Sequence, residues 1–313
     1  MHLRNTTRLT TFLLISTLFF ASCQSFHPQE EHNRVLLIGI DGVRVDGLKV
    51  ADTPNIDALV SNGAYTWDAY TGGELGKETQ QLTVSGPSWS SILTGVWVNK
   101  HRVWNNSFAD PNFDEYPHFF KRIREKRPEA YLSSIVSWDT MNELIPSGAD
   151  YKAIGNDEEV AEKAVEHLAT ADPDVLVVYF GDVDHAGHEW EFSPSVPEYT
   201  AAISKVDGYA GAVLNAVKKR PTYGNENWLT IVVTDHGGIG TEHGGQQPEV
   251  RTVFIIVSGK SAKRGEISPG PGIVAVPPTV MQHLGIEVEP EWKWEADAFG
   301  LNIEVTTQPD DKK

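Results

Sequence analysis

The stretch Val35-Leu36-Leu37-Ile38-Gly39-Ile40-Asp41-Gly42 decides the fold of this chain. Its first six residues form a short continuous apolar run, which is typical of a β-strand buried on both faces. Asp41 follows directly, and a carboxylate at the edge of an apolar core costs free energy unless another group compensates it. The stretch therefore predicts a buried strand that ends at a polar, ligand-binding edge of a sheet.

Similar apolar runs recur along the chain, and amphipathic stretches lie between them. The further runs cover residues 175–180, 229–233 and 253–257. The helical patterns cover residues 54–62, 116–126, 157–169 and 197–219. Buried strands that alternate with amphipathic helices predict an α/β fold. We expect a three-layer αβα sandwich, with a mostly parallel central sheet and helices on both faces.

The two ends of the chain are predicted to lie outside the folded domain. Residues 1–22 have a basic start and an apolar run too short to span a bilayer, which indicates a secretory signal. The run ends at Cys23, the only cysteine, and resembles a bacterial lipoprotein signal in which this residue is lipidated. An ordinary signal peptide that leaves a stray thiol is the alternative. We expect a flexible tether through residue 33, one domain over 34–305 and a disordered tail over 306–313.

These features predict an exported protein, held by lipid in the periplasm or outer cell envelope. The formal net charge of −17 argues against nucleic acid as a partner, because phosphate backbones bind basic surfaces. An anionic ligand needs local positive charge, which bound cations supply. We therefore expect a small anionic substrate and membrane contact only through the Cys23 lipid, and we predict no oligomeric state.

Metal-binding side chains follow three of the predicted strands. Asp41 follows the first strand, Asp184 follows the second, and Asp235 and His236 follow the third. In parallel sheets, ligands bind at the carboxyl ends of the strands. A single aspartate there would be interpreted as a helix cap or turn residue. Three at one edge predict a metal site.

Two more histidines extend this set. His188 lies four residues after Asp184, so both side chains can reach one cation from a turn or an opening helix. His243 lies seven residues after His236, in a glycine-rich loop. A polar loop with capping residues is the alternative. Two neighbouring side chains are rival ligands in the first group: Asp182 and His185.

Ser85 is the candidate nucleophile. It begins a stretch in which Pro87 suits a first helical turn and Thr94-Gly95 suits a helix end, so we expect it at the amino end of a short helix. The helix dipole and free N–H groups favour negative charge there. A serine hydroxyl is a weak nucleophile at neutral pH, and metal coordination would activate it. On its own, Ser85 would be interpreted as a helix cap.

In their order and spacing, these motifs resemble the alkaline phosphatase superfamily, and within it the type I phosphodiesterase and nucleotide pyrophosphatase group. The resemblance runs from about Arg34 to Gly285 and makes residues 34–305 a catalytic domain. It implies two divalent ions, usually zinc, with Asp184, His188 and His243 on one and Asp41, Asp235, His236 and Ser85 on the other. It implies in-line attack by Ser85, a phosphoseryl intermediate and cleavage of phosphodiester or pyrophosphate bonds.

Three residues are candidate substrate contacts: Ser88, Trp89 and Asn106. The Ser88 hydroxyl could donate one hydrogen bond to a phosphoryl oxygen. The Trp89 ring could stack on a nucleobase or sugar, although packing between helix and sheet is the alternative. Asn106 could place an amide near the site, or serve as a turn residue.

Two rival functions stay open. A sulfatase of the same superfamily would share Ser85-x-Pro87-Ser88, but Trp89 occupies the position where sulfatases carry arginine. They also usually carry paired aspartates where this chain has Asp41-Gly42. A non-catalytic, lipid-tethered envelope binding protein is the second rival. The complete ligand set and nucleophile disfavour it.

Overall fold

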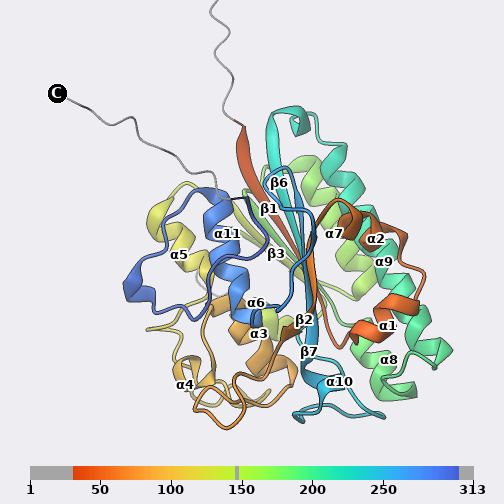
Figure 1. Ribbon diagram of the computed structural model, residues 1–313. Coiled ribbons are helices and arrows are strands. Elements are labelled where there is room, and N and C mark those ends of the chain that lie inside the picture. The colour runs from red at the N-terminus through yellow and green to blue at the C-terminus, as the bar shows by residue number, and fades with distance from the viewer. Residues whose placement is uncertain (1–30, 145–147, 303–313) are drawn as a thin grey trace, which may run out of the picture. The chain divides into compact units, whose positions relative to one another are not determined.

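An eight-stranded sheet forms the centre of the part of the chain that the computed structural model describes, residues 31–144 and 148–302 (Figure 1). The strands lie in the order β4-β3-β5-β1-β6-β7-β2-β8. Their bounds are β1 (His32–Ile40), β2 (Gly63–Tyr70), β3 (Leu132–Val136), β4 (Tyr151–Ile154), β5 (Val175–Phe180), β6 (Glu226–Val233), β7 (Thr252–Gly259) and β8 (Gly265–Glu266). The strand predicted at residues 35–40 is part of β1, which lies between β5 and β6.

The sheet is mostly parallel, as predicted. Strands β4, β3, β5, β1 and β6 run parallel to one another and β8 is parallel to β2, whereas β7 is antiparallel to both β6 and β2. The predicted strand at residues 253–257 lies in β7, so its carboxyl end points away from the edge that β1 reaches.

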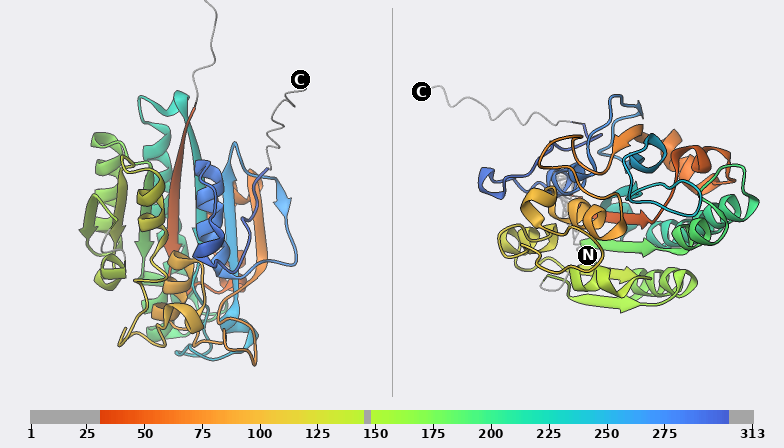
Figure 2. Two further views of the ribbon diagram at one scale, coloured as in Figure 1. Left: turned by 90° about the vertical axis from the view of Figure 1, so that its left-hand side faces the viewer. Right: turned by 90° about the horizontal axis from the view of Figure 1, so that it is seen from below.

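Helices cover both faces of the sheet, which confirms the predicted three-layer αβα sandwich (Figure 2). The helices are α1 (Val45–Val50), α2 (Pro54–Ser61), α3 (Ser85–Thr94), α4 (Val98–His101), α5 (Phe119–Lys126), α6 (Asp139–Leu144), α7 (Asp157–Thr170), α8 (Asp182–Trp190), α9 (Pro197–Lys218), α10 (Pro248–Arg251) and α11 (Val276–Leu284). Short 3₁₀ turns occur at Tyr223–Asn225, Ile273–Ala275 and Pro290–Trp292. Residues of α3, α5 and α11 pack on one face, and residues of α1, α2, α7 and α9 pack on the other.

The alternation of β1 side chains connects the two cores. Val35 and Leu37 belong to the cluster with α3 and α11, whereas Leu36, Ile38 and Ile40 belong to the cluster with α7 and α9. All five are at most 1% exposed, so the strand is buried on both faces, as its continuous apolar run predicts. Burial on both sides fixes the position of the residue that follows the strand.

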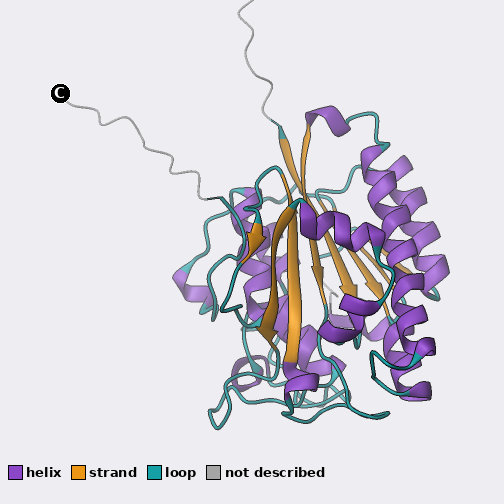
Figure 3. Ribbon diagram, turned by 45° about the vertical axis from the view of Figure 1, so that its right-hand side comes forward, coloured by secondary structure: helices purple, strands orange, loops and turns teal. Residues whose placement is uncertain are grey.

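Three adjacent strands end at one edge of the sheet. Gly39 of β1 pairs with Tyr179 of β5 on one side and with Val233 of β6 on the other. Loops and short helices gather at this edge (Figure 3). The residues that directly follow β5, β1 and β6 are therefore brought close together.

The ends of the chain are described only in part. The predicted signal over 1–22, Cys23 and the predicted tail over 306–313 lie outside the described residues. The tether predicted through residue 33 is too long, because β1 already begins at His32 and pairs there with Glu226. Within the described ranges, no helix has the length and apolar character needed to cross a bilayer.

Candidate functional site

The predicted ligands that follow β1 and β6 are buried together at the carboxyl edge of the sheet. Asp41 is 1% exposed, and both Asp235 and His236 are fully buried. His236 Nε2 lies 3.4 Å from Asp41 Oδ1 and 3.2 Å from Asp235 Oδ2. One imidazole nitrogen therefore faces two carboxylates inside the protein.

Ser85 completes this first group. It is the first residue of α3, as expected, and the helix ends at Gly95 in the left-handed region with φ 74°. The Ser85 Oγ lies 3.3 Å from His236 Nε2 and 3.4 Å from Asp41 Oδ1. The amino end of α3 thus places a hydroxyl directly against the buried acid–imidazole cluster.

A second group forms around α8. Asp184 and His188 lie one turn apart on this helix, with His188 Nε2 at 3.5 Å from Asp184 Oδ2. His243 Nε2 lies 3.6 Å from Asp184 Oδ1 and 3.0 Å from His188 Nε2. The structure therefore brings all seven predicted ligands into two adjoining groups.

Distances alone divide the ligands slightly differently from the predicted sets. One trio whose ligand atoms lie within 4.8 Å of one another contains Asp41, Asp235 and His236, as predicted for one metal. The other trio contains Asp184, His243 and again His236, rather than His188. His236 therefore adjoins both groups, and its ring stacks on that of His243 with centroids 3.9 Å apart.

The rival ligands lie away from this centre. The side chain of His185 is 78% exposed and lies 4.0 Å from Asp182, which also pairs with Lys205 at 3.1 Å. The two therefore belong to the exposed surface of α8.

Backbone carbonyls determine which nitrogen of each histidine faces the centre. The Nδ1 atoms of His188, His236 and His243 lie 2.7, 3.0 and 3.2 Å from the carbonyl oxygens of Thr241, Gly237 and Thr83. A carbonyl can only accept, so each Nδ1 carries the proton and donates. Each Nε2 then presents a lone pair to the centre, which is the arrangement that metal-binding histidines show.

The carboxylates also direct unpaired oxygens inward. Asp235 Oδ1 accepts a hydrogen bond from the backbone N–H of Gly42 at 3.2 Å. Its other oxygen, Oδ2, is buried and has no hydrogen-bond partner among the described residues, and the same is true of Asp184 Oδ1. Buried acceptors without donors are costly, and a cation would satisfy them.

The protonation behaviour of the cluster reflects this lack of donors. Burial, with Asp41 adding to it, raises the pKa of Asp184 to about 9. Burial, with Asp41 and Asp184 adding to it, raises the pKa of Asp235 well above its ordinary value. Burial also lowers the pKa of both His236 and His243 to about 3. Neutral imidazoles beside carboxylates form a mixed nitrogen and oxygen ligand set that suits a divalent cation.

Phe192 supports the histidines from behind. Its buried ring packs edge-to-face on His188 and His243, with centroid distances of 5.3 and 5.9 Å. A Cβ atom added at Gly187 or Gly238 would lie only 2.2 or 2.3 Å from this ring. The two glycines therefore make the space that the ring occupies.

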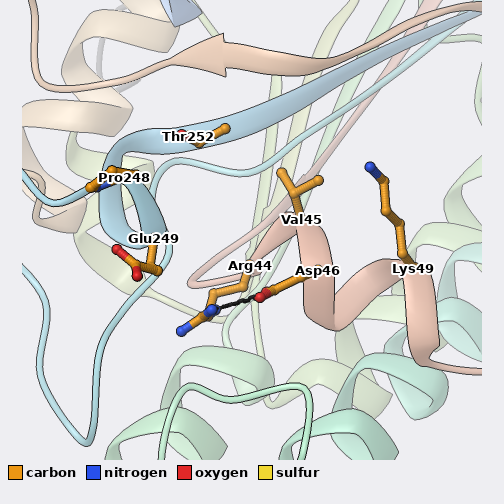
Figure 4. Close-up of a pocket in the computed structure, with 7 residues that line it drawn as sticks. All are labelled: Arg44, Val45, Asp46, Lys49, Pro248, Glu249 and Thr252. Carbon is orange, nitrogen blue, oxygen red and sulfur yellow. Dashed lines mark hydrogen bonds and ion pairs between the residues drawn. The ribbon is translucent and has the colours of Figure 1, made fainter.

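Arg44 forms hydrogen bonds to the two loops that surround the Phe192 ring. Its guanidinium donates to the carbonyls of Phe192 and Gly238 at 3.0 and 3.2 Å and pairs with Asp46 at 2.6 Å (Figure 4). It also lines a pocket of about 300 Å³ beside Glu249. The arginine thus links the segments that follow β1, α8 and β6.

Two of the three predicted substrate contacts are wrong. Ser88 is fully buried, and its hydroxyl bonds to that of Thr71 at 3.0 Å. Trp89 is 1% exposed and cannot stack on a substrate; its indole N–H donates to Asp41 Oδ2 at 2.9 Å. Asn106 is exposed, and its Oδ1 accepts from the backbone N–H of Gly86 at 2.7 Å. Its amide therefore lies beside the nucleophile, and its role as a substrate contact stays a prediction.

Tyr179 was missed by the sequence interpretation. Its hydroxyl donates to Asp41 Oδ2 at 2.6 Å from within β5. A tyrosine in an otherwise apolar buried run needs a hydrogen-bond partner, and that requirement was the available signal.

A family model described as type I phosphodiesterase / nucleotide pyrophosphatase matches residues 35–153 and 138–254. Among curated proteins, human ectonucleotide pyrophosphatase/phosphodiesterase family member 5 is 23% identical over 252 residues, covering 72% of this chain and 50% of that protein. The chain spans about half the length of the curated relatives it matches.

Two solved structures share the fold. A 2-O GAG sulfatase superposes with a TM-score of 0.68 at 17% identity, covering 84% of this chain and 72% of the other. Murine ectonucleotide pyrophosphatase / phosphodiesterase 5 superposes with a TM-score of 0.66 at 15% identity, covering 82% and 96%. At these identities, the similarity shows the architecture alone.

Metal-free protein is expected to lose stability as the pH rises from 7 to 9. An acid whose pKa is raised by folding, such as Asp184, stays protonated in the folded state over this window but ionises on unfolding, so unfolding becomes more favourable. Buried neutral histidines have the opposite effect, but mainly below pH 7, where the unfolded chain gains protons. Urea unfolding of protein treated with a metal chelator, at pH 7, 8 and 9, measures how the free energy of unfolding changes with pH.

A divalent cation such as zinc is expected to reverse this loss, because it would bind the ionised carboxylates of the folded state. Asp184→Asn is the matched control and should reduce the pH dependence of the chelated protein, leaving the part that Asp235 contributes. Constant or rising stability of chelated wild-type protein between pH 7 and 9 would contradict the interpretation of the cluster.

Proposed function

The chain belongs to the type I phosphodiesterase / nucleotide pyrophosphatase family, and from this premise we propose that it hydrolyses phosphodiester or pyrophosphate bonds with two divalent cations. One observation carries the proposal. The Ser85 Oγ lies 3.3 Å from His236 Nε2, in a buried cluster where Asp184 Oδ1 and Asp235 Oδ2 have no hydrogen-bond partner among the described residues. A nucleophile beside a cation-binding cluster suits phosphoryl transfer.

The ligand atoms fit two cations, which we propose to be Zn²⁺. Asp184, His188 and His243 would hold one, and Asp41, Asp235, His236 and Ser85 would hold the other. Inward Nε2 atoms and unpaired carboxylate oxygens are the donors that zinc takes in catalytic sites. When bound, the cations would neutralise charge on the phosphoryl group and favour the ionised form of hydroxyl groups beside them.

The chain's own residues supply the attack. We propose that Ser85 attacks phosphorus in line while the bond from phosphorus to the leaving-group oxygen breaks, which gives a phosphoseryl intermediate. Water then cleaves the bond between phosphorus and the serine oxygen, which releases the phosphate product and restores the hydroxyl. The Ser85 Oγ lies 3.3 Å from His236 Nε2 and 3.4 Å from Asp41 Oδ1, the atoms that would hold the cation, so the charge of the cation would favour loss of the hydroxyl proton. The amino end of α3 adds a favourable field for the negative charge that develops there.

Asn106 would contact the substrate. Its Oδ1 is fixed by the N–H of Gly86, which leaves the Nδ2 group as a donor close to Ser85. A donor held by the helix terminus is already oriented before substrate arrives, and such preorganised donors stabilise developing charge. We propose that this group binds a non-bridging phosphoryl oxygen.

A sulfate-ester hydrolase is the second candidate, because one structure that shares this fold is named a sulfatase. Trp89 disfavours it, since a buried neutral indole occupies the position where the sulfatase motif has arginine. A non-catalytic binding protein is the remaining alternative, and turnover of any ester excludes it.

Ser85→Ala is expected to lower kcat for a phosphodiester by roughly 10³-fold or more while most zinc stays bound, because the nucleophile is lost and six ligands remain. Wild-type protein loaded with zinc should cleave bis(p-nitrophenyl) phosphate or a dinucleoside pyrophosphate faster than p-nitrophenyl sulfate. Release of p-nitrophenol and of nucleotide measures the loss of kcat in the variant and the preference of the wild-type protein among these esters.

Turnover that persists in the alanine variant would overturn the covalent mechanism. Faster cleavage of the sulfate ester would favour the second candidate. No turnover of any ester by zinc-loaded wild-type protein would leave the binding-protein alternative.

Asn106→Ala is expected to lower kcat by about 10²–10³-fold with unchanged zinc content, because one preorganised donor is lost. Asn105→Ala is the matched control, since the Asn105 Oδ1 bonds only locally, to the N–H and hydroxyl of Ser107. Equal kcat values in the two variants would remove Asn106 from the proposed mechanism.

We also propose that the chain is exported and anchored in the cell envelope by a lipid on Cys23. The support is the sequence alone: a basic start, a short apolar run and the single cysteine at its end. In bacterial expression with labelled fatty acid, wild-type protein should carry label and sediment with membranes. Cys23→Ser should carry none, and equal labelling of the two would contradict the proposal.

A further inference from the structure

Two side chains, one from α3 and one from β5, hold one oxygen of Asp41. The Oδ2 atom accepts hydrogen bonds from the Trp89 indole N–H at 2.9 Å and from the Tyr179 hydroxyl at 2.6 Å. The other oxygen, Oδ1, lies 3.4 Å from both Ser85 Oγ and His236 Nε2. The carboxylate is therefore divided into an outer oxygen bound by protein and an inner oxygen that faces the centre.

Packing fixes both donors. The Trp89 and Tyr179 rings meet edge-to-face, with centroids 5.1 Å apart and planes at 78°. The indole lies over Gly39, where an added Cβ would come within 2.3 Å of its Cη2 atom. Gly39 is also the register partner of Tyr179 in the sheet. Gly39, the last residue but one of β1, thus makes room for the indole that contacts Asp41, the residue directly after β1.

The chemistry of these donors matches a ligand carboxylate. Both are neutral, so they hold Asp41 without cancelling the charge that a cation would bind. Two hydrogen bonds to one oxygen also resist rotation about the carboxylate torsion, which otherwise has a broad energy well. Outer hydrogen bonds of this kind orient metal ligands in proteins.

We propose that Trp89 and Tyr179 are positioning residues that make Asp41 a ligand through Oδ1 alone for the cation beside Ser85. This inference rests on the proposed function only in taking Asp41 as a cation ligand. It assigns to Trp89 the role of holding Asp41 inside the protein, in place of the substrate stacking expected from the sequence. It also gives Gly39 a functional reason, because a larger residue there would displace the indole.

The test compares zinc affinity in Trp89→Phe and Tyr179→Phe, which keep a ring and remove one donor each. In competition titrations against a chelator, one of the two zinc equivalents should bind about 10–100-fold more weakly in each variant, since loss of an outer partner costs that much. At saturating zinc, kcat should fall while KM stays within about twofold, because neither side chain reaches the substrate.

Trp97→Phe is the matched control. Trp97 is also a buried tryptophan, 3% exposed, but it stacks on Tyr70 rather than on the ligand cluster. It should bind both zinc equivalents like wild-type protein. A merely structural role for Trp89 would lower the midpoint of thermal unfolding in both tryptophan variants and leave zinc affinity unchanged, which would overturn the proposal.

Gly39→Ala tests the same mechanism without removing any polar group. The added methyl group should push the indole from Asp41 and weaken the same zinc equivalent. If this variant fails to fold by circular dichroism, the two phenylalanine variants still decide the question. Wild-type affinity in both of them overturns the inference.

The inference and the proposed function fail separately. Weaker zinc binding in the variants, with no ester cleaved by the zinc-loaded wild-type protein, would retain the positioning role and reject the hydrolase. Ester cleavage by the wild-type protein, with unaltered zinc binding in the variants, would retain the hydrolase and reject the positioning role. A wild-type protein that binds no zinc would overturn both.

Discussion

The close approach of buried carboxyl and imidazole groups at one edge of the sheet is the constraint on which this structure depends. The Nε2 atoms of His188 and His243 lie 3.0 Å apart, although each Nδ1 is committed to a backbone carbonyl. Carboxylate oxygens of Asp184 and Asp235 are buried nearby without donors. Such an arrangement persists only because packing holds it, and it becomes favourable when positive charge enters. The fold is the means of holding these groups against their mutual repulsion.

The parallel strands at the centre of the sheet hold the backbone of the site rigid. Strands β5, β1 and β6 are buried on both faces and end together, so the backbone at Asp41 and Asp235 has little freedom. The N–H of Gly42 bonds to Asp235, and the N–H of Asp41 bonds to the carbonyl of Phe180, which ties the three strand ends directly. The loops carry the remaining ligands, and Phe192 packs behind two of them. Rigid strands and supported loops together set the site.

The sequence predicted the parts of this arrangement that depend on order along the chain. Continuous apolar runs located β1, β5 and β6, and the acidic residues after them located the edge of the site. Strand β3 was missed because Ser133 and Ser134 interrupt its apolar pattern, and their hydroxyls find partners only in the folded state. The direction in which the side chains of α3 point could not be predicted from the sequence either. Ser88 and Trp89 lie about one turn beyond Ser85, roughly 4.5 and 6 Å along the axis of α3, and both side chains are buried in the protein interior.

The short segment between His236 and His243 has a consequence for how cations are taken up. It is closed by a backbone bridge between Ile239 and Glu242 and carries a ligand at each end, one for each proposed cation. Because the bridge ties the two ends together, a shift of either histidine on binding one ion would be transmitted to the other histidine, so the two occupancies would be linked. A single local element would then act as the coupling device of the pair.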